Sequence, residues 1–138
     1  MGRKPGKKPT KAEIEYERDL LVSVVQSSLN GIMALKAVRD DEGVIVDLEW
    51  LIVNEMACRM MGRTQDALLG KRLLDVLSGD KANGMFDRYV QVVESGRPMD
   101  HERHFSGLGG EGWFRITAVK LDEGLVVNIG DITAYKNR

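Results

Sequence analysis

The chain has 138 residues, enough for one domain with short tails and one modest core. Hydrophobic residues make up 43% and aromatic residues only 6%, which excludes a disordered chain and favours an aliphatic core filled by seven methionines. Because five of the 20 basic residues precede the first acidic residue, Glu13, the net charge of −1 conceals an acidic body, which argues against a nucleic-acid-binding face.

The single cysteine, Cys58, cannot form an internal disulfide, which suits a reducing compartment. The apolar runs are far too short to span a membrane, and the N-terminus lacks the apolar segment of a secretory signal. We therefore expect a cytoplasmic domain, either alone or as part of a larger membrane-bound parent.

Residues 1–10 hold two of the three prolines and two Lys/Arg clusters, so we expect a disordered basic tail. Residues 11–29 are predicted to form an amphipathic helix, since apolar residues recur there at helical spacing. Asn30 and Gly31 would end this helix, because both tolerate the left-handed conformation of a C-cap. The apolar positions of the helix are Ile14, Leu21, Val24 and Val25.

Residues 30–133 are predicted to form the folded domain. It begins with two strands, 32–38 and 44–53, which flank a Gly-containing turn and make an antiparallel hairpin. Strict alternation along the second strand predicts that three apolar residues share one face: Leu48, Trp50 and Ile52.

Several helices follow the hairpin. Asn54 and Thr64 are suitable N-caps for two short helices, Gly62 would end the first of them, and the longest helix of the body is predicted at Lys81–Ser95. Three further strands end the domain, at residues 99–105, 113–121 and 125–129. This order predicts an α+β fold: a five-stranded antiparallel sheet with short helices on one face, preceded by the N-terminal amphipathic helix.

No catalytic or metal-binding constellation stands out. The segment Gly107–Gly112 matches G-x-G-x-x-G, but a strand follows where a dinucleotide site needs a helix, so we interpret it as an open hairpin loop. His101 and His104 would point to opposite faces of a strand, which excludes a shared metal ion. Cys58 has no evident base or positive group beside it, so a packed structural thiol is favoured. We predict no catalytic residues and no metal site.

Four short motifs, in this order, resemble the PAS (Per-Arnt-Sim) family of sensor domains, found in bacterial histidine kinases and diguanylate cyclases. They are Val-Asn-Glu-Met-Ala at 53–57, Leu-Leu-Gly-Lys at 68–71, Trp-Phe-Arg at 113–115 and Asp-Ile-Thr at 131–133. The resemblance extends over residues 20–136 and implies the five-stranded PAS sheet.

In this family the concave face of the sheet and the middle helices enclose a pocket that in some members holds haem, flavin or a small metabolite. Flavin adduct chemistry would need a reactive Cys where this chain has Leu73, and haem ligation would need a His within 81–95, so the resemblance argues against both cofactors. It implies a mostly apolar pocket suited to a small apolar metabolite; alternatively, the same residues only form the core. The nine pocket candidates are Leu48, Trp50, Ile52, Met61, Leu73, Phe86, Tyr89, Phe105 and Trp113.

The resemblance also implies that Asp131, Ile132 and Thr133 relay a signal toward the output domain of a kinase or cyclase, with residues 134–138 beginning the linker. The helix at 11–29 would then be the dimerisation element. The leading interpretation is a non-enzymatic, homodimeric sensory module of bacterial signal transduction, such as a two-component system or a diguanylate cyclase. The alternative is a ligand-free PAS dimerisation or protein-interaction module. The dimerisation residues would be Ile14, Leu21, Val24 and Val25.

Overall fold

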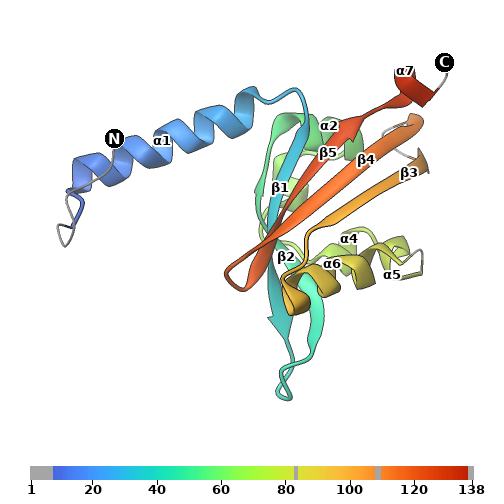
Figure 1. Cartoon of the computed structure of the whole chain (residues 1–138), viewed down its shortest axis with the longest axis horizontal. Coiled ribbons are helices and arrows are strands. Elements are labelled where there is room, and N and C mark those ends of the chain that lie inside the picture. Colours follow the sequence, from blue (N-terminus) through green and yellow to red (C-terminus); the bar gives the residue numbers. More distant parts are fainter. Residues whose placement is uncertain (1–7, 83, 108–109, 137–138) are drawn as a thin grey trace.

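Five strands form one curved sheet, several short helices cover one side of it, and a long helix leaves the body (Figure 1). The computed structural model describes residues 8–82, 84–107 and 110–136; the side chains of residues 22–27, 82, 106, 107, 110 and 136 lie outside that description. The helices are α1 (Lys11–Ser27), α2 (Glu55–Met61), α3 (Gln65–Leu68), α4 (Leu73–Val76), α5 (Gly79–Ala82), α6 (Met85–Ser95) and α7 (Thr133–Lys136). The strands are β1 (Gly31–Arg39), β2 (Ile45–Val53), β3 (Met99–Gly107), β4 (Gly110–Leu121) and β5 (Gly124–Asp131).

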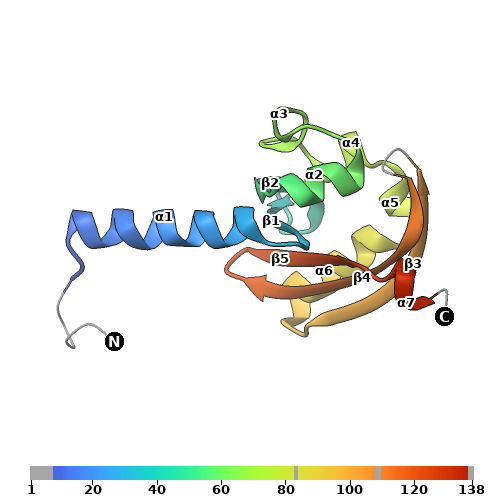
Figure 2. The ribbon, with the colours of Figure 1, turned by 90° about the horizontal axis from the view of Figure 1, so that it is seen from above.

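The strand order is β2-β1-β5-β4-β3, and every neighbouring pair is antiparallel. The first and last strands of the chain are therefore side by side in the middle of the sheet. Helices α2 to α6 carry the chain from one edge strand to the other on the inner side of the sheet (Figure 2). The predicted α+β fold is confirmed.

Local capping signals in the sequence are used as predicted. The Asn54 side chain accepts a hydrogen bond from the Ala57 amide at the start of α2, and Gly62 ends that helix at a φ of 66°. Thr64 caps α3 by accepting from the Ala67 amide. Both short helices thus begin, and α2 also ends, where their own sequence directs.

The predicted helix Lys81–Ser95 is wrong at its N-terminal end. Gly84 has a φ of 87°, and α6 begins only at Met85. A residue in that conformation cannot continue a right-handed helix, so the single predicted helix is two, α5 and α6. The C-cap predicted at Asn30 and Gly31 is also wrong, because neither residue has a positive φ and Gly31 already belongs to β1.

Strict alternation fails in β2, because the strand contains irregularities of register. Ala34 of β1 pairs with Ile52, but the next residue, Leu35, pairs with Trp50, so one extra residue bulges from β2. Beyond such a bulge the two faces of a strand exchange places. Val53 is consequently 1% exposed and Ile52 46% exposed. The prediction that Ile52 shares a face with Leu48 and Trp50 is wrong.

The pleat of β4 places Trp113 on the outer face of the sheet. Ile116 and Ala118 are buried on the inner face, and Phe114, which is in phase with them, packs against the core. Trp113 points the other way and meets the ring of His104 edge-on, with 5.5 Å between ring centroids. Trp113 is therefore wrong as a candidate for the inner pocket, and Phe114 is the aromatic residue that the sequence interpretation missed.

The glycine-rich segment is mostly strand and not an open loop. Gly107 pairs with Gly110, and Ser106 pairs with Glu111, so β3 and β4 continue almost to the tip of their hairpin. Residues 108–109 lie outside the described part of the chain. Gly112 has a separate role: a Cβ atom there would lie 2.6 Å from Thr133 Oγ1, so glycine permits the close approach of α7.

The two tryptophans provide a matched test of this assignment of faces. Trp50 is 1% exposed, and its indole Nε1 donates to Met33 Sδ at 3.3 Å inside the core. We expect Trp50→Ala to lower the free energy of unfolding by about 3–5 kcal/mol, the usual range for a buried aromatic truncation. Trp113→Ala should cost clearly less, because its ring covers the outer face. Urea denaturation of both variants measures the difference; equal losses would contradict the assignment.

Candidate functional site

Seven of the nine pocket candidates lie on the inner side of the sheet. Five are buried in one hydrophobic cluster and two are partly buried against it. The buried residues are Leu48, Trp50, Leu73, Phe86 and Tyr89, and the partly buried ones are Met61 and Phe105. They come from β2, β3, α2, α4 and α6, so the fold gathers distant segments into one apolar interior.

The end of this interior nearest β3 is aromatic and positively charged. Phe105 meets Phe114 edge-on at 5.8 Å, and the Arg103 guanidinium lies 5.7 Å from the centre of the Phe105 ring. His101, half-buried on the same face of β3, has its pKa lowered by burial first and then by Arg88 and Arg103. Its imidazole is thus biased toward the neutral form, while His104 points outward, as the predicted alternation requires.

Two further groups of the interior favour their neutral forms. Burial raises the pKa of the Tyr89 hydroxyl, with a smaller contribution from Asp80. Burial also raises the pKa of the Cys58 thiol, and Glu55 adds to the effect. A thiol kept protonated is a poor nucleophile, which supports a packing role for Cys58.

An open hollow of about 370 Å³ lies on the helical side, between α2 and α3. It is lined by Glu55, Cys58, Thr64 and Gln65, and none of the nine pocket candidates is among these described lining residues. Within the described residues, no group of three or more His, Cys, Asp or Glu side chains could hold a metal ion. No described helix combines the length and apolar character needed to cross a membrane.

The connection from β5 to α7, here called the C-terminal junction, is held by a compact set of hydrogen bonds. Asp131 Oδ1 accepts from the Thr133 amide at 2.9 Å and from the Thr133 hydroxyl at 2.6 Å. The Trp113 amide donates to Thr133 Oγ1 at 3.0 Å, and the Ile132 amide donates to the Trp113 carbonyl at 2.9 Å. Asp131, Ile132 and Thr133 thus attach α7 directly to β4.

The connection from α1 to β1, residues 28–30, is attached to the body by asparagine side chains. Asn54 Nδ2 donates to the Asn30 carbonyl at 2.9 Å, and Asn30 Nδ2 donates to Asn128 Oδ1 at 2.9 Å. The local sequence indicates Asn54 only as a helix cap and gives no signal for Asn128, because their partners here lie many residues away along the chain.

Helix α1 projects from the body (Figure 1), and several of its described apolar side chains are exposed to solvent. Ile14 is 43% exposed and Leu21 is 65% exposed. The side chains of Val24 and Val25, the other two predicted dimerisation residues, lie outside the described part of the chain.

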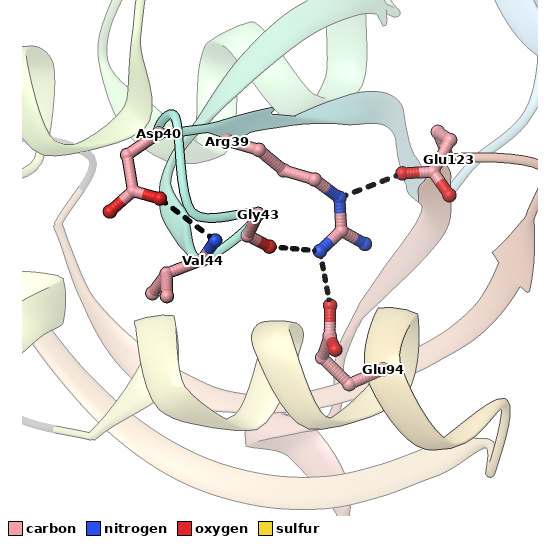
Figure 3. Close-up of polar contacts among 6 residues, drawn as sticks. All are labelled: Arg39, Asp40, Gly43, Val44, Glu94 and Glu123. Atoms are coloured by element: carbon pink, nitrogen blue, oxygen red, sulfur yellow. Dashed lines mark hydrogen bonds and ion pairs between the residues drawn. The ribbon is translucent and has the colours of Figure 1, made fainter.

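At the opposite end of β1, Arg39 connects three segments (Figure 3). Its Nε donates to Glu123 in the β4–β5 turn at 3.0 Å. Its Nη1 donates to the Gly43 carbonyl at 2.7 Å and lies 2.8 Å from a carboxylate oxygen of Glu94 on α6. The hydrogen bond to Glu123, followed by that to Glu94, raises the pKa of Arg39. Through these contacts Arg39 links helix α6 and two turns to the end of β1.

The comparisons with known proteins agree with this architecture. The sequence profile of the family described as PAS fold matches residues 33–137. A search of curated protein sequences finds no match. Among solved structures, a domain of a sensory box sensor histidine kinase/response regulator from Geobacter sulfurreducens has a TM-score of 0.65 at 19% identity, covering 88% of this chain and 100% of that one.

Two further structures are similar. The PAS domain of BvgS from Bordetella pertussis has a TM-score of 0.61 at 20% identity, covering 92% of this chain and 90% of that chain. A domain of an HTR-like protein from Haloarcula marismortui has a TM-score of 0.58 at 22% identity, covering 77% and 100% of the two chains. At these identities the structures show a shared fold, and the sequence profile shows the family. The chain belongs to the PAS family and is a sensory domain of the kind found in signalling proteins.

Proposed function

We propose that this PAS domain binds a small, mostly apolar ligand on the inner side of its sheet and relays the event through its terminal helices, as a homodimer. One observation carries the relay: Gly31, which opens β1, pairs with Ile129 near the end of β5. Helices α1 and α7 therefore leave from the same end of the sheet, so one movement there acts on both. A signal of this kind is a shift between two packing arrangements, each favoured by a different ligand state.

The proposal places the module in the cytoplasm, attached in a parent protein to an output domain such as a histidine kinase or a diguanylate cyclase. The similar structure from a sensor histidine kinase/response regulator supports this setting. In that arrangement, Asp131, Ile132 and Thr133 hold the start of the linker that leads to the output domain. Neither the binding of the ligand nor the relay through the terminal helices requires catalysis by this domain.

A second candidate function is a ligand-free dimerisation module. It is favoured by the tight packing of the inner side, where Leu48 and Leu73 have no exposed surface and Trp50 has 1%. An interior filled in this way could serve only as a core that supports the terminal helices. The two functions differ in whether the interior opens for a ligand.

Dimerisation is supported by α1 itself. A 17-residue helix is only marginally stable in water unless another element packs on it, and the described apolar residues of α1 that are exposed, Ile14 and Leu21 among them, gain stability if a second helix covers them. The outer face of the sheet offers another apolar surface, because Ile52, Ala34, Val126 and Val119 pair successively across four strands. Both surfaces would be covered in a homodimer.

Native mass spectrometry of freshly purified protein tests ligand binding directly. We expect a non-covalent mass on each chain that is lost on denaturation, and a complex of two chains. The denatured mass of the same sample is the control. Dimers at bare chain mass, unchanged after incubation with a library of small apolar metabolites, would replace the sensor proposal with the dimerisation module.

The double substitution Ile14→Glu and Leu21→Glu tests the dimer interface. Burying two added carboxylates should weaken the dimer by more than about 1.4 kcal/mol, a factor of 10, and leave the circular dichroism of the body unchanged. Sedimentation equilibrium measures the dissociation constant. Arg18→Glu, also on α1 and exposed, makes the same total change in charge and should have a smaller effect. If Arg18→Glu weakens the dimer as much as the double substitution does, the loss comes from the added negative charge, and the result would contradict an apolar interface at Ile14 and Leu21.

The substitution Thr133→Val tests the C-terminal junction. It keeps the shape of the side chain but removes both the hydroxyl donor to Asp131 and the acceptor for the Trp113 amide. Loss of one such hydrogen bond costs about 1 kcal/mol, so the Trp113 amide should exchange with solvent roughly fivefold faster. Thr117→Val on the outer face of β4 is the matched control, and hydrogen exchange followed by NMR is the measurement. An unchanged rate would show that the junction does not protect this amide.

A further inference from the structure

The first residue of β1 packs against α2 with no spare room. A Cβ atom added to Gly31 would lie 3.0 Å from Met60 Sδ, 3.1 Å from the Ala57 Cα and 3.2 Å from the Ala57 Cβ. The backbone of β1 therefore rests directly on the helix surface. Since such a contact has almost no compressibility, a displacement of α2 must displace the start of β1 or open a void.

Asn54 binds the same two elements through one buried side chain. It has no exposed surface, and its Oδ1 accepts from the Ile32 amide of β1 and the Ala57 amide of α2, both at 2.9 Å. Its Nδ2 donates to the carbonyl of Asn30, the residue just before β1. Breaking any of these bonds would leave a buried polar group unsatisfied, which proteins rarely tolerate.

The connection from α1 to β1 is short and fixed at its end. Only residues 28–30 separate α1 from β1. Within this connection the Asn30 amide donates to Ser28 Oγ at 3.1 Å, and the Asn30 side chain donates to Asn128 on β5. Asn30 is thus bonded to Asn54 through its carbonyl and to β5 through its side chain, so the direction in which α1 leaves depends on both.

We infer that Asn54 and Gly31 couple the position of α2 to the direction of α1. Movement of α2 passes through the Asn54 side-chain amide and the Gly31 contact to Asn30, and so changes the direction of α1, which ends just before this connection. The biological use of this coupling rests on the proposed relay through the terminal helices. The coupling itself is a property of the ligand-free chain and can be measured on it.

The experiment measures the distance between two nitroxide labels by pulsed electron spin resonance. One label is placed on α1 at Arg18 and the other on the body at Lys120, both exposed. Cys58→Ala removes the native thiol, and labelled chains are diluted into unlabelled protein so that only distances within one chain contribute.

Two variants perturb the coupling in different ways. Gly31→Ala inserts a methyl group between β1 and α2, and it should shift the mean distance between the labels. Asn54→Asp keeps an acceptor for the α2 cap but loses the donor to Asn30, and it should broaden the distance distribution. Arg39→Gln is the matched control, because it breaks a comparable set of hydrogen bonds at the other end of β1. It should leave both the mean and the width unchanged.

Distributions for Gly31→Ala and Asn54→Asp that match the Arg39→Gln control would overturn the inference. If Asn54→Asp does not fold, the exposed Asn30→Ala variant takes its place, since it loses the bond to Asn128 and should broaden the distribution in the same way. Unchanged width in that variant, with an unchanged mean in Gly31→Ala, would also overturn the inference. Absence of a ligand in native mass spectrometry would affect the sensor proposal alone, since these distances are measured without one.

Discussion

The buried side-chain amide of Asn54 is the interaction on which the arrangement of this domain depends. It begins α2, pairs with the start of β1 and binds the carbonyl of Asn30, all with no exposed surface. The position needs an acceptor and a donor in one short side chain. Aspartate lacks the donor, serine is too short to reach both partners, and an apolar residue would remove the side-chain partner of three backbone groups, those of Asn30, Ile32 and Ala57.

The alternation of side chains along each strand determines which residues face the helices and which face outward. On the inner face, Leu48, Trp50 and Val53 meet the helices, and this spacing exists only because β2 bulges between its last two inward residues. On the outer face, Trp113 packs on His104 and its backbone receives the C-terminal junction. The inner face thus supplies the apolar interior that a ligand would enter, and the outer face carries groups that attach the terminal helices.

The two ends of the sheet have different roles. At one end lie the connections to both α1 and α7, because β1 begins next to the end of its antiparallel neighbour β5. At the other end Arg39 fastens α6 and two turns to β1 (Figure 3). The two ends of the sheet thus differ in what they connect: the inner helix α6 and two turns at one end, and the terminal helices at the other.

The sequence by itself determined the α+β order, the caps at Asn54, Gly62 and Thr64, and the Asp131–Thr133 motif, because each depends on residues a few positions apart. Tertiary structure alone decided the rest. Strand register decides that Phe114, and not Trp113, points inward, and that Ile52 is exposed to solvent. This register is set by the partner strands and not by the local sequence pattern. Gly31 was expected to end a helix, but it provides the space for α2. The partners of Asn30 and Arg39 lie many residues away along the chain, and only the folded backbone brings such groups within hydrogen-bonding distance.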